Sequence, residues 1–534
     1  MTKEPTAGAR ELFEAVHGGA EDAVVGLLRA GTPADVTDED GQTPLYLAAV
    51  SDEVGIVRLL LAAGAAPERA GGPEGGDLPL CGAAVGGHTE VVRALLAAGA
   101  RPDLPEAYGF TAMVWAVGQG HAGTVEVLLE YGADPDLPGP SGEPPLVLAT
   151  RRGSPSTVRA LLRRGAGATE AALAEARQWL VRDVERELRE GLLQAYGVRD
   201  SEEYETFARR VEEDGGVTVV VELLREGRPL AGTEQQTGHG AIATLLEGEL
   251  GILTPYAELA ERALRCGDPD QDDWVESVTA LWSRGDEETF QAAAAWCASD
   301  DPLRQAFAAD VLAQLGFVGP GPDEDAGRDG AAGRDADPGL DADARPDGSG
   351  PRRPFAARAL PLLRELSREA RDPELIQAVV LGLGHHGDPA ALPEILRHAG
   401  HPDAEVRHRV ALALCGLVPG GHAEGIEAVI ALSRDADTHV RDWATMALAG
   451  IEADTHEIRE ALAARLNDPD ADTAAEAARG LAMRQDPRAA AALARILADE
   501  DPDGYARDTA VDAVRHLQDV PLRRRLEQTS PRCR

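Results

Sequence analysis

Apolar residues in the first 168 positions come in pairs of short stretches, and each pair closes on a glycine followed by a small residue. The closing dipeptides are Gly31-Thr32, Gly64-Ala65, Gly99-Ala100, Gly132-Ala133 and Gly165-Ala166. Successive dipeptides are separated by 33, 35, 33 and 33 residues. A nearly constant period of this size predicts stacked two-helix units, each of which buries its apolar face only against its neighbours.

A helix-start signal precedes four of these closing pairs, in step with the glycines. The four signals are Thr43-Pro44-Leu45, Leu78-Pro79-Leu80, Thr111-Ala112-Met113 and Glu143-Pro144-Pro145-Leu146. Proline fits the first turn of a helix because its missing N–H would have no intrahelical partner there, and the Thr43 hydroxyl can cap that end. The pattern therefore predicts where each repeat begins.

The second repeat resembles the ankyrin repeat most fully. Its matching residues are Leu78-Pro79-Leu80, Ala83-Ala84, Gly87-His88, Val91-Val92 and Leu95-Leu96, and the third repeat keeps Gly120-His121. The histidine that usually follows Thr-Pro-Leu is replaced in the four repeats by Tyr46, Cys81, Val114 and Val147. The resemblance implies an ankyrin-repeat domain over residues 1–168, with a capping repeat and four full repeats, in which His88 and His121 brace the loops.

A second periodicity runs through the C-terminal half, where Asp/Pro turns precede helices that end in glycine. The best copies run from His401-Pro402-Asp403 through Val406-Arg407 to Gly416, and from Asp435-Ala436-Asp437 through Val440-Arg441 to Gly450. This pattern resembles the short HEAT-like repeat also found in phycobilisome bilin lyases, over residues 286–317 and 354–528. We expect Arg407 and Arg441 to pair with acids between repeats, such as Asp403 and Asp437.

The segments between these repeats are less regular. Residues 169–285 predict an irregular helical connector, in which apolar positions from Leu173 to Leu192 suit one amphipathic helix, and the strand-like run 217–221 is ambiguous. Residues 318–353 are rich in Asp, Gly, Pro and Ala, which predicts a disordered acidic loop. The expected fold class is therefore all-α, with two α-solenoids joined by the connector.

Composition narrows the range of partners. The formal net charge of −40 disfavours nucleic acid and anionic membranes and favours a basic protein partner, although acidity can also serve solubility alone. Five scattered cysteines, no leader-like start and no apolar run of 18 residues predict a cytoplasmic protein. Lys3 is the only lysine, and heavy use of Ala, Gly and Arg resembles a GC-rich bacterial, actinobacterial-like sequence.

The sequence holds none of the familiar catalytic motifs. There is no phosphate-binding Gly-Lys-Ser/Thr loop, no Gly-x-Ser-x-Gly and no His-Glu-x-x-His. Six histidines do lie close together in the sequence: His385, His386, His398, His401, His408 and His422. Deoxyhypusine hydroxylase resembles this half in architecture and binds two irons through several His-Glu pairs, whereas this chain has only His456-Glu457. We assign no catalytic residue, metal or cofactor.

The ankyrin resemblance implies that loop tips and first-helix residues contact the partner. Mapped onto this sequence, the candidate partner-binding residues are Glu39, Asp40, Gln42, Val50, Ser51, Tyr108, Phe110, Gln119, Tyr131, Arg151, Arg152 and Arg164. Tyrosine and arginine are residue types that dominate interface energies. Tyr108 and Phe110 can alternatively staple the turn to its helix, and Trp115 is expected in the core.

These observations favour a non-enzymatic adaptor that binds partner proteins on the concave surfaces of its solenoids. Two other hypotheses remain open. One is an enzyme or enzyme-maturation factor, bilin-lyase-like or hydroxylase-like, that uses the histidine-rich repeats. The other is a regulatory or immunity protein that masks a basic partner.

Overall fold

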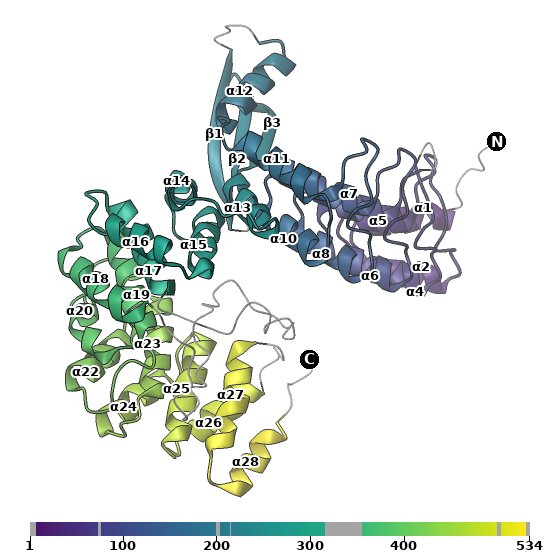
Figure 1. The fold of residues 1–534 in the computed structure, drawn as a ribbon. Coiled ribbons are helices and arrows are strands. Elements are labelled where there is room, and N and C mark those ends of the chain that lie inside the picture. Colours follow the sequence, from purple (N-terminus) through teal and green to yellow (C-terminus); the bar gives the residue numbers. More distant parts are fainter. Residues whose placement is uncertain are drawn as a thin grey trace. The chain divides into compact units, whose positions relative to one another are not determined.

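The structure is a computed structural model that describes residues 7–72, 76–198, 203–213, 215–315, 355–498 and 504–529. Within this part of the chain there are 28 α-helices, one short 3-10 helix and three β-strands. The chain divides into two compact units, residues 1–280 and 281–534 (Figure 1). Each unit is dominated by stacked helix pairs, which confirms the expected fold class of two helical solenoids.

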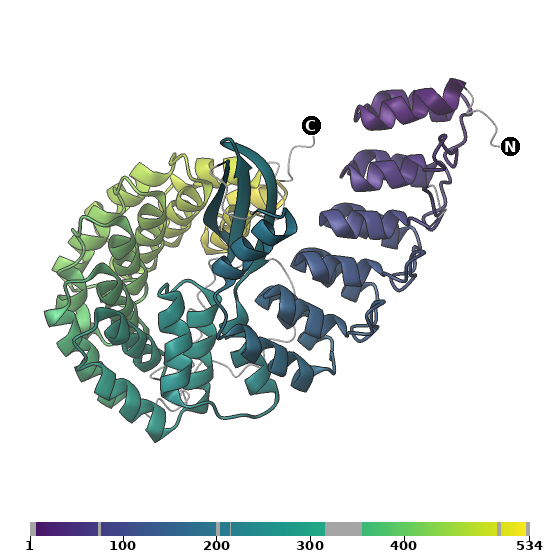
Figure 2. The ribbon, with the colours of Figure 1, turned by 90° about the horizontal axis from the view of Figure 1, so that it is seen from above.

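Unit 1 contains two layers of helices. The first layer is α1 (Ala7–His17), α3 (Pro44–Val50), α5 (Pro79–Gly86), α7 (Ala112–Gln119), α9 (Pro145–Arg152) and α11 (Thr169–Trp179). The second layer is α2 (Glu21–Arg29), α4 (Val54–Ala62), α6 (Thr89–Ala97), α8 (Ala122–Glu130), α10 (Pro155–Arg163) and α13 (His239–Glu249). Each helix packs against its counterpart in the next pair (Figure 2). One continuous core runs from Leu12 to Leu246.

The helix ends follow the sequence signals. The hydroxyl of Thr43 accepts a hydrogen bond from the backbone N–H of Tyr46, and Thr111 caps α7 in the same way. Gly87 and Gly120 end α5 and α7 with φ of +71° and +81°, a conformation that glycine adopts without strain. The next residues, His88 and His121, occupy the N-cap positions of the second-layer helices α6 and α8. Their Nε2 atoms lie 3.2 and 3.1 Å from the carbonyl oxygens of Val50 and Val85, which confirms the expected bracing.

The helix array continues beyond residue 168 into a sixth helix pair. Helix α11 packs on α9, while α13 packs on both α11 and α10. A Gly-His pair marks the start of this second-layer helix too. Gly238-His239 stands at the start of α13, as Gly87-His88 stands just before α6. Residues 180–238 separate the two helices of this pair, so the regular period of the sequence does not reveal it.

The insertion between α11 and α13 contains one helix and a sheet. Helix α12 (Val184–Ala195) packs on a three-stranded antiparallel sheet of β1 (Tyr204–Glu213), β2 (Gly216–Arg225) and β3 (Arg228–Gln236), in the order β1-β2-β3. Its small core contains Leu192, Val219, Val221 and Leu223. The connector thus differs from the expected helical pairs, because the β-branched run 217–221 forms the central strand.

The apolar positions from Leu173 to Leu192 do not form one helix. Helix α11 ends at Trp179, and α12 begins after Asp183, whose carboxylate accepts a hydrogen bond from the backbone N–H of Arg186. Two further helices, α14 (Tyr256–Cys266) and α15 (Asp272–Arg284), follow α13. Arg159 of α10 forms ion pairs of 2.8 and 2.9 Å with Asp272 and Glu276, which hold α15 against the array.

Unit 2 also has two layers. One contains α17 (Pro302–Leu315), α19 (Pro373–His386), α21 (Ala404–Ala413), α23 (Thr438–Gly450), α25 (Ala471–Met483) and α27 (Tyr505–His516). The other contains α16 (Glu287–Trp296), α18 (Ala356–Glu369), α20 (Leu392–Leu396) after the 3-10 helix Pro389–Ala391, α22 (Ala423–Leu432), α24 (His456–Arg465), α26 (Ala489–Leu497) and α28 (Val520–Glu527). Successive helices of the first layer pack on one another, including α17 on α19. The acidic loop expected at 318–353 lies outside the described residues.

Arginines join neighbouring repeats in unit 2, but with different partners from those expected. Arg407 donates to Asp435 at 2.7 and 2.9 Å. Arg441 donates to Asp468 through Nε and Nη2, each at 3.0 Å. Asp403 and Asp437 were expected to receive these arginines, but their carboxylates cap α21 and α23. Each arginine therefore reaches the acid at the start of the following repeat.

Candidate partner-binding surface

The first-layer helices and the loops that precede them form what we call the inner face of the array. Glu39 and Asp40 are exposed in the loop before α3, Val50 and Ser51 are exposed where α3 ends, and Gln119 is exposed near the end of α7. Tyr131 and Arg164 are the capping residues at the C-terminal ends of second-layer helices α8 and α10, so the structure does not bring them to the inner face.

One of the candidate residues, Phe110, forms part of a small cluster, and a second, Gln42, contacts that cluster. The Phe110 ring stacks on Trp115 with their centroids 4.6 Å apart, and the Trp115 indole N–H donates to the Glu106 carboxylate at 2.9 Å. In the neighbouring loop, the Gln42 amide donates to Asp77 at 3.3 Å. Trp115 is partly buried at the edge of the core rather than inside it, because its indole N–H serves this loop.

The two carboxylates in this region lie close enough to influence each other. Burial raises the pKa of Glu106, and the charge of Asp77 raises it further, while the Trp115 hydrogen bond opposes the shift. The pKa of Tyr46 on α3 is also raised, first by burial and then by Asp77 and Glu106. Among the described residues, neither carboxylate forms an ion pair with a cationic side chain. We call Tyr46, Asp77, Glu106, Phe110 and Trp115 the acidic–aromatic cluster.

Tyr108 stands beside this cluster in the sequence but remains outward, with 65% of its surface exposed. It lies at the tip of a tight loop, in which the backbone N–H of Glu106 donates to Phe110 and that of Gly109 donates to Glu106. The alternative that both aromatic residues staple the turn to its helix therefore holds for one of them only. Phe110 staples the loop to α7 through Trp115, whereas Tyr108 is presented to solvent.

Arg151 and Arg152 are engaged within the unit. Arg151 forms ion pairs of 2.6 Å with Glu143 and 2.9 Å with Glu175 on α11. Arg152 donates to the Glu234 carboxylate on β3 at 2.8 Å. Their acidic partners Glu175 and Glu234 belong to the connector, whose structure the sequence does not predict. Both guanidinium groups are therefore engaged in ion pairs within the unit, which leaves them less available to a partner than expected.

The base of the inserted sheet is seated on the ends of α7 and α9. The Gln235 amide donates to the carbonyl oxygens of Arg151 and Arg152 at 2.9 and 2.6 Å, and Gly238 N–H donates to Gly153 at 3.1 Å. A methyl group at Gly153 would lie 2.3 Å from the Gln236 carbonyl oxygen, so only glycine permits this approach. The sheet consequently has a fixed seat on the array.

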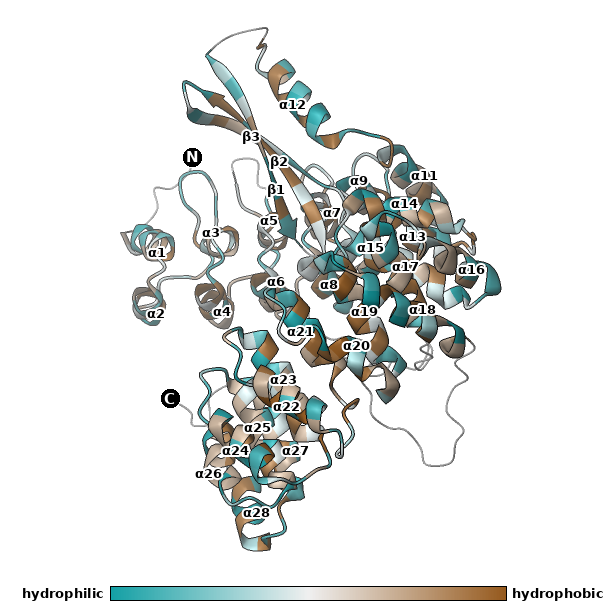
Figure 3. Cartoon of the chain, turned by 90° about the vertical axis from the view of Figure 1, so that its left-hand side faces the viewer, coloured by the Kyte–Doolittle hydropathy of each residue, from teal (hydrophilic) through white to brown (hydrophobic). Residues whose placement is uncertain are grey.

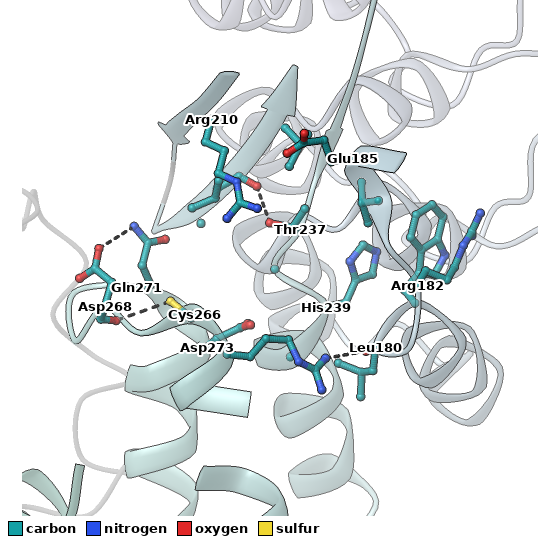
Figure 4. Close-up of a pocket in the computed structure, with 18 of the residues that line it drawn as sticks. Leu180, Arg182, Glu185, Arg210, Thr237, His239, Cys266, Asp268, Gln271 and Asp273 are labelled. Atoms are coloured by element: carbon teal, nitrogen blue, oxygen red, sulfur yellow. Dashed lines mark hydrogen bonds between the residues drawn. The ribbon is translucent and has the colours of Figure 1, made fainter. Parts of the chain in front are cut away.

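A cavity of about 610 Å³ marks the point where the insertion leaves and rejoins the sixth helix pair (Figure 4). In its wall the His239 ring stacks on Trp179 with centroids 4.7 Å apart. Burial lowers the pKa of His239 to about 4 and raises the pKa of Asp273 to about 6. Arg265 closes part of the wall by donating to the Leu180 carbonyl oxygen at 2.5 Å. His239 and Asp273 therefore place two buried groups with shifted pKa values at this joint.

The histidine-rich region of unit 2 does not form a cluster of ligands in the described part of the chain. Nowhere among the described residues do three or more His, Cys, Asp or Glu side chains lie in positions that could hold a metal ion. Burial, helped by the charge of Arg397, lowers the pKa of His398 to about 4. The His422 ring caps its own helix by accepting from Gly425 N–H at 3.0 Å.

Two solenoids of stacked helix pairs, one with an inner face that carries the acidic–aromatic cluster, define a helical-repeat protein. Residues 12–106 and 80–171 match the family model of ankyrin repeats, and residues 359–449 and 426–515 match that of HEAT repeats. Both kinds of repeat are generally protein-interaction scaffolds. No curated protein matches the chain. In the described residues, every helix is too short or too polar to cross a lipid bilayer.

Several residues of this surface escape sequence reasoning. The sequence pattern marks Tyr46 only as a departure from the usual histidine, and it does not single out Asp77 or Glu106. A usable signal is present, because both acids lie in loops that precede first-layer helices, at Leu78-Pro79 and at Thr111. Such loops of adjacent repeats are neighbours in an ankyrin array, so acids in them are expected to meet.

Proposed function

We propose that this protein is a non-enzymatic scaffold that holds a basic partner protein on the inner face of its ankyrin array. The observation that carries the proposal is the pair Asp77 and Glu106, two carboxylates near enough for the charge of Asp77 to raise the pKa of Glu106, neither of which forms an ion pair among the described residues. An arginine or lysine of a partner would relieve their repulsion.

Other candidate residues lie on the same inner face and its loops and extend the proposed contact. Glu39 and Asp40 add negative charge, Tyr108 adds an exposed aromatic ring, and Val50 adds apolar surface. The net charge of −40 supports a protein partner over nucleic acid. The proposal includes a cytoplasmic location, which the unpaired thiols of Cys81, Cys266, Cys297 and Cys415 support.

The test is affinity capture from host lysate by the full chain, followed by mass spectrometry and measurement of the affinity for any recovered protein. The test variant is Asp77→Asn with Glu106→Gln, which removes both charges but keeps the hydrogen-bonding shape. The control variant, Asp22→Asn with Glu249→Gln, removes two exposed charges from second-layer helices. We expect the test variant to lose the partner and the control to keep it. Equal retention by both variants would reject the cluster as the binding site.

A further inference from the structure

The inserted sheet has two faces of different character. Residues that alternate along each strand lie on opposite faces, so Val219, Val221 and Leu223 share the face covered by α12. The strand register places Phe207 opposite Glu222 and Leu224 opposite Glu205 on the other face. Figure 3 shows α12 along one side of the sheet only. We call the side of the sheet that α12 does not cover the open face.

The open face carries large apolar side chains that the unit does not cover. Phe207 is 53% exposed, and Leu224 on the same face is partly buried. Leu230, which alternates in phase with Glu234 and Gln236 along β3 and lies at the β-bulge opposite Leu224, is 44% exposed. The solvent side of an antiparallel sheet normally carries polar residues. Exposed apolar side chains gathered on one face are typical of interaction surfaces. Phe207, Leu224 and Leu230 therefore form an apolar strip toward the hairpin that joins β2 and β3.

The same face contacts the ankyrin array at its base. Glu234 pairs in register with Val220 and Gln236 with Thr218, and these positions alternate in phase with Phe207 and Leu224. Glu234 receives the Arg152 guanidinium, and the Gln236 side chain lies next to Gly120 at the end of α7. The open face thus contacts the array at the end of the sheet that holds Glu234 and Gln236. The apolar strip, toward the β2–β3 hairpin, is left uncovered.

Acidic side chains accompany the strip. Among the described residues, Glu205 and Glu222 form no ion pair, and both share the open face with Phe207. Arg209 is a basic residue on the same face, so the immediate charge is modestly negative, in a unit whose inner face already presents Asp77 and Glu106. A second copy of this strongly acidic chain is disfavoured as the occupant by charge repulsion.

We propose that the open face is a second contact site for the same basic partner, and that it takes apolar side chains flanked by arginine or lysine. This inference rests on the proposed function, because it assigns a further part of the same interface. The partner segment would place apolar side chains on Phe207, Leu224 and Leu230, with neighbouring cations near Glu205 and Glu222. The array would hold the remaining cations at the acidic–aromatic cluster.

The experiment uses a display library of random 16-residue peptides, selected against the full chain, and then individual synthetic peptides from the selection. Their affinities are measured by calorimetry for the parent, for Phe207→Ser with Leu230→Ser, and for Asp77→Asn with Glu106→Gln. The control is Val181→Ser with Leu253→Ser, which removes two exposed apolar side chains elsewhere in unit 1. Thermal melting shows that each variant is folded.

We expect selected peptides that combine apolar residues with Arg or Lys, and an affinity at least tenfold weaker for the Phe207/Leu230 variant than for the control. If only the Asp77/Glu106 variant loses affinity, the open face is not part of the interface and the proposed function survives. If neither variant loses affinity, both proposals fail. Light scattering that shows a dimer abolished by Phe207→Ser with Leu230→Ser would instead identify a second copy as the occupant.

Discussion

The guanidinium of Arg152, at the end of α9, donates to the carboxylate of Glu234 on β3 at 2.8 Å, although 82 residues separate the two in sequence. The contact joins the regular part of the ankyrin array to an insertion that sequence periodicity does not reveal. Arg152 is largely buried in this contact, while Glu234 is about half exposed. The pair therefore helps to fix the orientation of the open face.

Breaking this pair should loosen the insertion more than the array. We expect Arg152→Ala and Glu234→Ala each to increase hydrogen exchange in residues 228–236, with a coupling free energy of about 0.5–1 kcal/mol in a double-mutant cycle, as for a partly exposed ion pair. Exchange measured by mass spectrometry checks the first part and urea unfolding the second. Additive effects in the cycle would show that the two side chains do not interact.

The contact between the inserted sheet and the end of α9 can be tested by substituting two glycines that share a backbone conformation. Gly153 and Gly165 have φ of +78° and +80°, but only at Gly153 would a methyl group meet another segment. Alanine at Gly165 should cost about 1 kcal/mol of unfolding free energy from backbone strain alone. Alanine at Gly153 should cost clearly more and also increase exchange around Gln236. Equal costs by urea unfolding would mean that the insertion is not seated on α9.

Acidification should act in opposite directions on two groups at the joint. His239, with 3% of its surface exposed, has its pKa lowered from 6.5 to about 4, so its contribution to stability is lost as pH falls from 6.5 toward 4. That loss approaches about 3 kcal/mol. Asp273 has its pKa raised from 3.8 to about 6, so its contribution is present at low pH and is lost as pH rises through 6.

The two contributions can be separated by substitution. Relative to the parent chain, His239→Gln should lose less stability between pH 6.5 and 4, and Asp273→Asn should lose more. Urea unfolding at several pH values provides the measurement, with differences from the parent removing the effect of the many other carboxylates. Parallel pH curves for all three chains would contradict the assignment.

In unit 2, the arginine contacts between repeats should contribute to stability. Arg441 pairs with Asp468, a carboxylate that is almost completely buried and has Arg465 as a second partner at 3.1 Å. We expect Arg441→Met to lower the unfolding free energy by about 2 kcal/mol, less than for a buried acid left with no partner. Arg434→Met, at an exposed position, serves as the control and should change it by less than about 0.5 kcal/mol.

Tyr108 should affect binding more than stability. The side chain is 65% exposed at a loop tip, so Tyr108→Ala should lower the unfolding free energy less than Phe110→Ala does. Partner affinity should fall at least tenfold if the ring contacts the partner, as exposed aromatic anchors do. Phe110→Ala is the contrasting variant, because loss of its stack on Trp115 should lower stability as well. Unchanged affinity for Tyr108→Ala would remove it from the surface.

Local signals explain what sequence predicts correctly in this fold. Thr43, Thr111 and the closing glycines act within a few residues, so they mark the repeats wherever those repeats lie. The sixth helix pair depends instead on α11 meeting a helix far along the chain, which leaves no regular spacing to detect. Arg151 and Arg152 suit an interface by residue type, but their acids lie in the unpredicted segment.

The divided sixth helix pair imposes an order on folding during synthesis. Helix α11 leaves the ribosome before the insertion, yet its pairing helix α13 follows only after residues 180–238 have been made. Until then, the apolar face that α11 shares with α13 and the exposed end of the array lack their cover. Because domains fold from the N-terminus as they emerge, the earlier pairs can stack first, and the last closes as a long-range step that depends on the sheet being made. The insertion thus sets the time at which the ankyrin array is completed.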